Sequence, residues 1–379
     1  MDFALTDAQQ QIRDEVLRLC GRFDDGYWLE RDQTATFPDA FFAAMAAGSW
    51  LGIAMPEEYG GAGLGITEAA ILMQAVAESG ACMSGASAIH LNIFGLNPVV
   101  VFGNEEQKKR WLPPLIAGKE RACFAVTEPN TGLNTRALKT KADKRGDRYF
   151  VSGQKVWIST AQVAEKILLL AKTDAGLTLF YTDLDRKYVE VREIEKMGRH
   201  AVDSNQVFFD ALPVPEADRI GEEGKGFEYI LHGMNPERIL IAAELVGLGR
   251  CAVDRAAAYA KSRIVFDRPI GQNQAIQHPL AKNWAELEAA NLMVMKAAWL
   301  YDQGQECGAE ANAAKYMCSE AAFEACTRAL MTFGGYGYAK EFHVERLWRE
   351  VRLYKIAPVS QQMALNYVSE HVLGLPKSY

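Results

Sequence analysis

The first 119 residues carry apolar positions at helical spacing, interrupted by turn residues. Residues 67–79 form one long apolar helical stretch. Residues 105–111 predict another helix, which we expect to end at Pro113 and Pro114, because proline removes a backbone donor. This pattern predicts an N-terminal helical domain over residues 1–119.

The period changes to that of β-strands in residues 120–222. Residues 149–158 alternate between apolar and polar positions. Residues 167–171 and 177–181 are two apolar runs separated by the turn residues 174–176, which is the pattern of paired strands. We therefore predict a small antiparallel β-domain in the middle of the chain.

Helical spacing returns in residues 223–379. Three alanine-rich segments, 239–262, 277–303 and 309–333, are each long enough for a helix of a bundle. The order helical, β, helical argues against a doubly wound parallel fold, in which strands and helices would alternate throughout. The sequence thus predicts an α+β protein that is mainly α.

Composition narrows the class of protein. The chain has 379 residues, of which 49% are hydrophobic, and its formal net charge is −7. An acidic balance disfavours binding to nucleic acid or to an anionic membrane surface, since both require basic patches. We expect no membrane span, because we find no uninterrupted apolar stretch that approaches the length needed to cross a bilayer.

The cysteines and histidines predict neither disulfides nor a metal site. Seven cysteines are scattered along the chain without a Cys-x-x-Cys pair. This usage is typical of reduced, buried thiols in a cytoplasmic protein. Six histidines are equally dispersed and show no metal-binding spacing, so we expect no metal.

Two short segments of the middle region are candidate ligand contacts. Residues 124–135 run from a strand into a turn that presents the hydroxyl of Thr127 and exposed backbone amides. Further on, Trp157 at a strand end is able to cover one face of a flat cofactor, and Ser159 to donate to a ring nitrogen. Taken singly, an ordinary polar turn and a core tryptophan explain both segments as well.

The third region adds two more segments. Arg263 lies after a helix, where a guanidinium is able to pair with a pyrophosphate or simply to complement the helix C-terminus. Gly334 and Gly335 allow close backbone approach to a ligand, or a helix C-cap. The glycine-rich residues 221–226 lack the strand and helix of a dinucleotide fingerprint, so we interpret them as a loop at a domain junction.

The order and spacing of these motifs are more specific than any one of them. Phe-Ala-Val-Thr-Glu-Pro from Phe124, Trp-Ile-Ser from Trp157, Arg-x-x-Phe from Arg263 and Phe-Gly-Gly from Phe333 follow one another along the chain. Together with Pro-Glu-Glu-Tyr-Gly-Gly from Pro56, the series resembles the acyl-CoA dehydrogenase family over essentially the whole chain. The resemblance implies an N-terminal helical domain, a middle β-domain and a C-terminal four-helix bundle.

The same resemblance implies FAD as cofactor and a homotetramer built as a dimer of dimers. Thr127, Trp157 and Ser159 match positions that hold the flavin ring, with Ser159 at N5. A second set matches positions that reach the FAD of a neighbouring subunit: Arg263, Phe266, Gln274, Gly334 and Gly335.

The catalytic base requires a choice between two places in the chain. Most members of the family carry a glutamate near the C-terminus, but Pro358 stands at that position here. A minority, resembling isovaleryl-CoA and long-chain dehydrogenases, carry the base on a bundle helix just before an arginine. Glu237 and Arg238 match this arrangement, so we assign Glu237 as the base, in a dry pocket expected to raise its pKa, and Arg238 as the residue that positions it or the substrate.

Glu244 is the rival of Glu237. Seven residues apart, the two lie within about 20° on a helix and so share a face, roughly 10 Å apart along its axis. The alternative role for Glu237 is that of a solvated acid at a helix start.

Three positions depart from the family pattern. Pro358 lacks the N–H that, in the family, donates to the thioester oxygen. Leu133 and Met331 stand where a serine and a glutamine are frequent in the family.

The function expected from the resemblance is oxidation of an acyl-CoA thioester between Cα and Cβ in fatty acid metabolism. Electrons would pass to an electron-transfer flavoprotein. One alternative is a relative acting on acyl-carrier-protein thioesters or working as an enoyl-thioester reductase. A second is a non-catalytic binding protein on the same fold.

Overall fold

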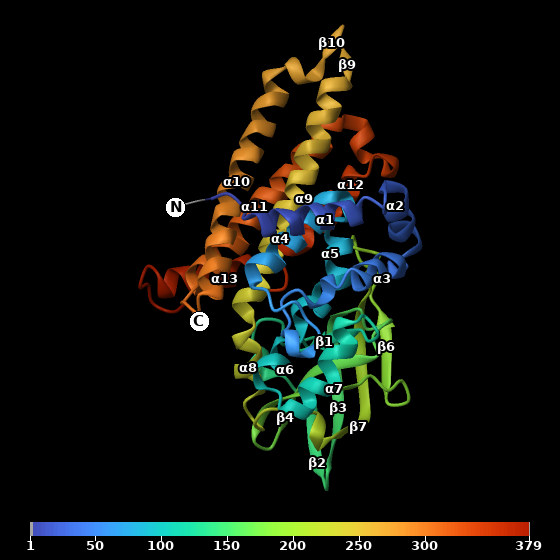
Figure 1. Ribbon diagram of the computed structural model, residues 1–379, viewed down its shortest axis with the longest axis vertical. Coiled ribbons are helices and arrows are strands. Elements are labelled where there is room, and N and C mark those ends of the chain that lie inside the picture. The colour runs from blue at the N-terminus through green and yellow to red at the C-terminus, as the bar shows by residue number, and fades with distance from the viewer. Residues whose placement is uncertain (1–2, 379) are drawn as a thin grey trace.

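The computed structural model describes residues 3–378 and consists of a tall helical body with a β-sheet at one end (Figure 1). Helical elements occupy both ends of the chain, and the strands lie between them in sequence. The predicted fold class, α+β and mainly α, is confirmed. The exact boundaries at residues 119/120 and 222/223 stay a prediction.

The N-terminal region is helical, as its spacing predicts. Its α-helices are α1 (Asp7–Cys20), α2 (Asp25–Thr34), α3 (Asp39–Ala47), α4 (Ile66–Val76), α5 (Cys82–His90), α6 (Asn97–Phe102) and α7 (Glu105–Ile116).

One helix end differs from the prediction. Helix α7 continues through Pro113 and Pro114 and ends at Ile116. The fixed φ of proline is compatible with a helix, and only its missing N–H and ring contacts are unfavourable. Burial of Trp111 and Leu115 on either side of the prolines offsets that cost.

The run Ile66–Phe102 is long and apolar enough, by length and composition, to cross a membrane, contrary to our expectation from the sequence. The prediction missed it because single polar residues interrupt the run. Within the protein 67% of its most apolar window is buried. Helix α4 packs against α9 and α10, and the run serves as a core helix there.

The middle region forms one sheet, whose strand order is β6-β7-β3-β2-β4-β5-β8, with β1 beside β4. Most neighbours are antiparallel, including the predicted pair β4–β5, but β4 runs parallel to both β1 and β2. The strands are β1 (Ala122–Ala125), β2 (Lys141–Arg145), β3 (Arg148–Ser159), β4 (Lys166–Thr173), β5 (Gly176–Asp183), β6 (Val189–Glu193), β7 (Ser204–Pro215) and β8 (Arg219–Ile220).

The C-terminal region is a helical bundle. Helices α9, α10 and α11 pack pairwise, and α13 packs against α11. Helices α9 and α10 extend to a short hairpin, β9–β10, at the end of the molecule opposite the sheet (Figure 1). The elements are α8 (Gly226–His232), α9 (Met234–Ser262), β9 (Ile264–Val265), β10 (Arg268–Pro269), α10 (Gln274–Asp302), α11 (Gly308–Phe333), α12 (Val344–Arg352) and α13 (Gln361–His371).

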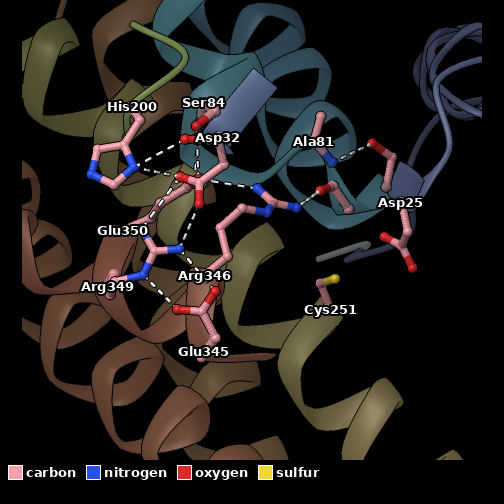
Figure 2. A network of polar contacts seen from close by, with 12 residues as sticks. Asp25, Asp32, Ala81, Ser84, His200, Cys251, Glu345, Arg346, Arg349 and Glu350 are labelled. Atoms are coloured by element: carbon pink, nitrogen blue, oxygen red, sulfur yellow. Dashed lines mark hydrogen bonds and ion pairs between the residues drawn. The ribbon is translucent and has the colours of Figure 1, made fainter. Parts of the chain in front are cut away.

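A buried ion pair within α12, Arg346–Glu350, is hydrogen-bonded to the N-terminal helical region (Figure 2). Glu350 accepts hydrogen bonds from the backbone N–H and the hydroxyl of Ser84 on α5, at 3.0 and 2.7 Å. Arg346 donates to Glu350 at 3.0 Å and to the carbonyl of Gly80 at 2.6 Å. These contacts fix α5 against the bundle, and α5 carries residues of the site described next.

Candidate active site

Trp157 lies at an irregularity of the sheet. The register between β3 and β7 shifts between Val156 and Ile158, and Trp157 has a φ of 62°. A bulky residue with positive φ is rare, and bulges often redirect a side chain beside a functional site. The Trp157 side chain is accordingly not part of the core: it is 60% exposed.

Thr127 lies next to this bulge. Its carbonyl accepts a hydrogen bond from the N–H of Val156 at 2.9 Å. The following residue, Glu128, is buried and accepts from the amides of Lys139 and Thr140 and from the ammonium of Lys155. The carboxylate of Glu128 therefore holds the loop after β1 in place against β3.

Ser159 connects the sheet to the N-terminal helices through Arg199. The guanidinium of Arg199 donates to the hydroxyl of Ser159 at 3.0 Å and to that of Ser87 on α5 at 3.1 Å. Ser87 also shares a hydrogen bond of 3.1 Å with the hydroxyl of Tyr354. Strand β3, helix α5 and the segment after α12 thus meet at one place.

The predicted base, Glu237, also contacts helix α5. Glu237 lies in the first turn of α9, and its Oε2 is 2.7 Å from Nε2 of His90, the last residue of α5. The other ring nitrogen, Nδ1, is 2.7 Å from Oε1 of Glu244. The side chain of Glu237 is 21% exposed, whereas that of Glu244 is 0% exposed.

The protonation preferences of this cluster differ from the prediction. Burial alone would raise the pKa of Glu237, but the nearby His90 outweighs it and holds the pKa below its usual value. Our expectation of a raised pKa is therefore wrong, because no motif in the sequence indicated a cationic partner for Glu237. Burial prevails at Glu244, whose pKa is raised despite the same histidine.

Arg238 turns back onto its own helix. Its guanidinium donates to the carbonyl of Met234 at 3.0 Å and to the side chain of Asn235 at 3.3 Å. Near Pro358, the amides of Ile356 and Ala357 both donate to the carbonyl of Leu353. The amides that precede the proline are therefore already paired.

The second predicted set of cofactor contacts lies at the far end of the bundle. Arg263, Gly334 and Gly335 line one hollow of about 450 Å³, together with Tyr259 and Phe333. The exposed residues Phe266 and Gln274 belong to the hairpin next to it and to the start of α10, and Phe266 is 94% exposed. From Glu237 to the end of α9 the helix rises roughly 38 Å.

Two observations fit a flat polar cofactor beside Trp157. A strained backbone position presents a large aromatic face to the surface instead of the core. Four residues after Thr127, the hydroxyl of Thr131 is buried and, within residues 3–378, has no hydrogen-bond partner. A buried donor without a partner is the kind of group that a ligand satisfies.

The sequence did not point to His90 or Arg199. Neither belongs to a motif, and the contacts that place them in the site are to residues distant in the chain. The only signal was a histidine in an otherwise apolar helical stretch.

The site is thus an acid–base cluster at the junction of two helical domains and a sheet, and family models match each of these parts. The acyl-CoA dehydrogenase N-terminal domain matches residues 6–119, the middle domain 123–212 and the C-terminal domain 224–373. Acyl-CoA dehydrogenase FadE12 of Mycobacterium tuberculosis is 36% identical over 389 residues, which cover 100% of this chain and 99% of that protein. The chain therefore belongs to the acyl-CoA dehydrogenase family, which is a family of oxidoreductases.

Other relatives share the full length. CarC, a subunit of the caffeyl-CoA reductase-Etf complex of Acetobacterium woodii, is 32% identical over 98% of this chain and 96% of its own. The structure of butyryl-CoA dehydrogenase from Megasphaera elsdenii has a TM-score of 0.94 at 28% identity, covering 98% of this chain and 100% of that one. The FAD complex of PigA has a TM-score of 0.94 at 25% identity, covering 99% and 100%.

Proposed function

We propose that this chain is an FAD-dependent dehydrogenase of acyl-CoA thioesters, with Glu237 as the base that removes the Cα proton. The observation that carries the proposal is the placement of Glu237. It is a carboxylate held by His90, and it is the only one of the two candidate acids with an exposed surface. A base must reach its proton before its pKa matters.

Each residue of the site has a separate role in the proposed reaction. Glu237 accepts the Cα proton, and the electron pair of that C–H bond becomes the new Cα–Cβ double bond as a hydride leaves Cβ. Bound FAD supplies the acceptor for that hydride. Thr127, Trp157 and Ser159 hold and cover the cofactor ring, and the Arg199 bridge fixes Ser159 relative to α5. Arg238 stays next to the base and favours its ionised form.

The cofactor site is completed by a second copy of the chain. Trp157 and Ser159 lie at the end of β3 that meets α5, and Thr127 lies beside them. Arg263 follows α9 and precedes β9, and the β9–β10 hairpin lies at the end of the molecule opposite the sheet (Figure 1). Helix α9 rises roughly 38 Å from Glu237 to its end just before Arg263. This length argues against one chain supplying both the base and the pyrophosphate contact of a single site. We therefore propose that Arg263, Phe266, Gln274, Gly334 and Gly335 bind the FAD of a partner subunit, in a homotetramer built as a dimer of dimers.

An electron-transfer flavoprotein is the proposed electron acceptor, and fatty acid metabolism in the cytoplasm the proposed setting. The name of CarC, which joins a reductase to an Etf complex, supports this kind of partner. The same name shows that a relative works as a reductase. Since one base and one hydride acceptor serve both directions, the direction of flux is a separate question from the identity of the site.

The first experiment measures anaerobic bleaching of bound FAD by a panel of acyl-CoA thioesters. We expect at least one thioester to bleach the wild-type protein. Glu237→Gln should bind FAD with an unchanged spectrum, but its bleaching should slow by at least about 10²-fold, because a positioned general base contributes about 10²–10⁴-fold in rate.

Glu228→Gln is the matched control, since Glu228 is an exposed acid on the preceding helix α8. It should bleach like the wild type. Bleaching that persists in Glu237→Gln but disappears in Glu244→Gln would refute the assignment of the base. A wild-type protein that holds FAD but is bleached only by pantetheine-protein thioesters would favour the carrier-protein alternative.

A further inference from the structure

His90 connects two acids that the sequence presented as rivals. Both ring nitrogens lie 2.7 Å from a carboxylate oxygen, Nε2 from Glu237 and Nδ1 from Glu244. The imidazole and Glu244 are buried, and Glu237 alone opens outward. The second oxygen of Glu237, Oε1, has no hydrogen-bond partner within residues 3–378, so it is the free end of this three-residue chain.

The two hydrogen bonds fix how many protons the cluster holds. An ionised carboxylate only accepts, and a neutral imidazole donates from one nitrogen alone. Two bonds therefore require two protons, either on an imidazolium between two carboxylates or on a neutral imidazole and one carboxyl group. In both arrangements the net charge of the cluster is −1.

The surroundings favour the imidazolium form. Burial lowers the pKa of His90, but the two glutamates outweigh it and raise the pKa well above its ordinary value. Beyond these two acids, Arg238 acts on Glu237 and Arg199 on Glu244. Tyr354, whose hydroxyl lies 3.1 Å from that of Ser87, is a further titratable group that interacts with Glu244.

We propose that His90 is a positioning residue that presents Glu237 to the substrate as an anion, and that Glu244 orients the imidazole from behind. The proposal rests on the role of Glu237 as the base. The contact of Glu244 with Nδ1 holds the imidazole ring in one orientation, so that Nε2 faces Glu237. When Glu237 takes the Cα proton, the cluster holds three protons instead of two, and its net charge rises from −1 to 0.

A charged His90 has a measurable consequence. Without it, two carboxylates face each other across a buried site, and the ionised form of Glu237 loses its nearest cation. The acid limb of the bleaching rate against pH, which reports protonation of the base, should then move to higher pH.

The experiment compares pH profiles of bleaching in FAD-loaded protein. In His90→Gln we expect the acid limb to rise by about one pH unit or more, the size of shift that a lost neighbouring charge produces. Glu244→Gln disturbs the same hydrogen-bonded cluster but leaves the imidazole beside Glu237, so its acid limb should not rise. His371→Gln, at an exposed position of α13, should keep the wild-type profile.

His90→Ala tests whether a changed profile in His90→Gln comes from loss of the imidazole or from a disturbed structure. It leaves space for free imidazole, and adding imidazole should return its acid limb toward the wild-type position, whereas His90→Gln should not respond. The proposal is overturned if the acid limb of His90→Gln lies at the same pH as that of the wild type. It is also overturned if His90→Ala is active but its acid limb does not move when imidazole is added.

Failure of this inference is distinguishable from failure of the proposed function. If no thioester bleaches the wild type, or if Glu237→Gln is still bleached, the function itself is wrong. If the wild type is bleached and Glu237→Gln is not, an unchanged profile in His90→Gln removes only the role of His90.

Discussion

At the scale of single residues, the sequence predicts the acids of the site but not the group that joins them. The seven-residue spacing of Glu237 and Glu244 places both on one face of α9, and the structure confirms this because both contact His90. His90 is 147 residues from Glu237 in the chain. Its role depends on how α5 packs against α9, which local patterns do not encode. The pKa of Glu237 was therefore predicted in the wrong direction.

Trp157 allows a residue-scale test that separates a cofactor contact from a core residue. We expect Trp157→Ala to change the unfolding free energy of the FAD-free protein by less than about 0.5 kcal/mol, since the side chain is largely exposed. FAD affinity should fall about tenfold through lost stacking, which corresponds to about 1.4 kcal/mol. Flavin absorbance retained after gel filtration and chemical denaturation measure the two effects.

The buried Trp28 provides the contrast for that test. Trp28→Ala should cost about 3–5 kcal/mol of unfolding free energy. A comparable loss in Trp157→Ala would show that Trp157 is part of the core after all.

At the scale of elements, hydrophobic periodicity predicts the identity of the long helices and the main strands. It fails where packing overrides local chemistry, as in α7, which continues through two prolines. It also does not show that β4 runs parallel to β1 and β2. The apolar run of residues 167–171 indicates a strand buried on both faces, but it does not identify the neighbouring strands. Contacts between helices far apart in the sequence are likewise not predicted by local patterns.

Asp32 on α2 is one such contact, and it predicts a pH dependence of stability. Its carboxylate accepts from Arg349 on α12 at 2.6 Å and lies 3.1 Å from Nδ1 of His200 (Figure 2). Burial alone would raise the pKa of Asp32, but His200 and Arg349 outweigh it and hold the pKa well below the usual range. A lowered pKa means that the stabilisation is complete above the unfolded pKa of about 3.9 and is lost as the pH falls further.

Asp32→Asn should therefore lower the unfolding free energy at pH 7 by about 2 kcal/mol, the worth of hydrogen bonds to a charged group. The difference from the wild type should shrink as the pH falls below about 4. Denaturant titrations at several pH values measure this, with the exposed residue changed in Asp14→Asn as control. A difference that stays constant with pH would contradict the assignment.

At the scale of the whole molecule, the sequence predicts three regions in the right order but not where they meet. Ser159, Ser87 and Glu237 come from the sheet, an N-terminal helix and the bundle, and Arg199 and His90 bring them to one junction. The resemblance implied that part of the cofactor site comes from a neighbour. The length of α9 gives a physical reason, since it separates the base from Arg263.

That separation makes a complementation test possible. Arg263→Ala should lower FAD affinity by roughly 10–100-fold, because a charge-assisted hydrogen bond to the pyrophosphate is lost. Glu237→Gln should keep FAD but lose the base. If one site uses Glu237 from one subunit and Arg263 from the other, a mixed dimer of the two variants contains one intact site and one doubly defective site.

At an FAD concentration that leaves the sites of Arg263→Ala largely empty, co-expression of the two variants should therefore restore bleaching. The restored fraction is about a quarter of all sites if the chains pair at random in symmetric dimers. The comparison is a preparation in which each variant is expressed alone and the proteins are mixed after folding, where subunits that do not exchange give no recovery. If both residues served the same site within one chain, every site of the mixed dimer would carry one defect. Co-expression would then restore nothing, and the shared cofactor site would have to be abandoned.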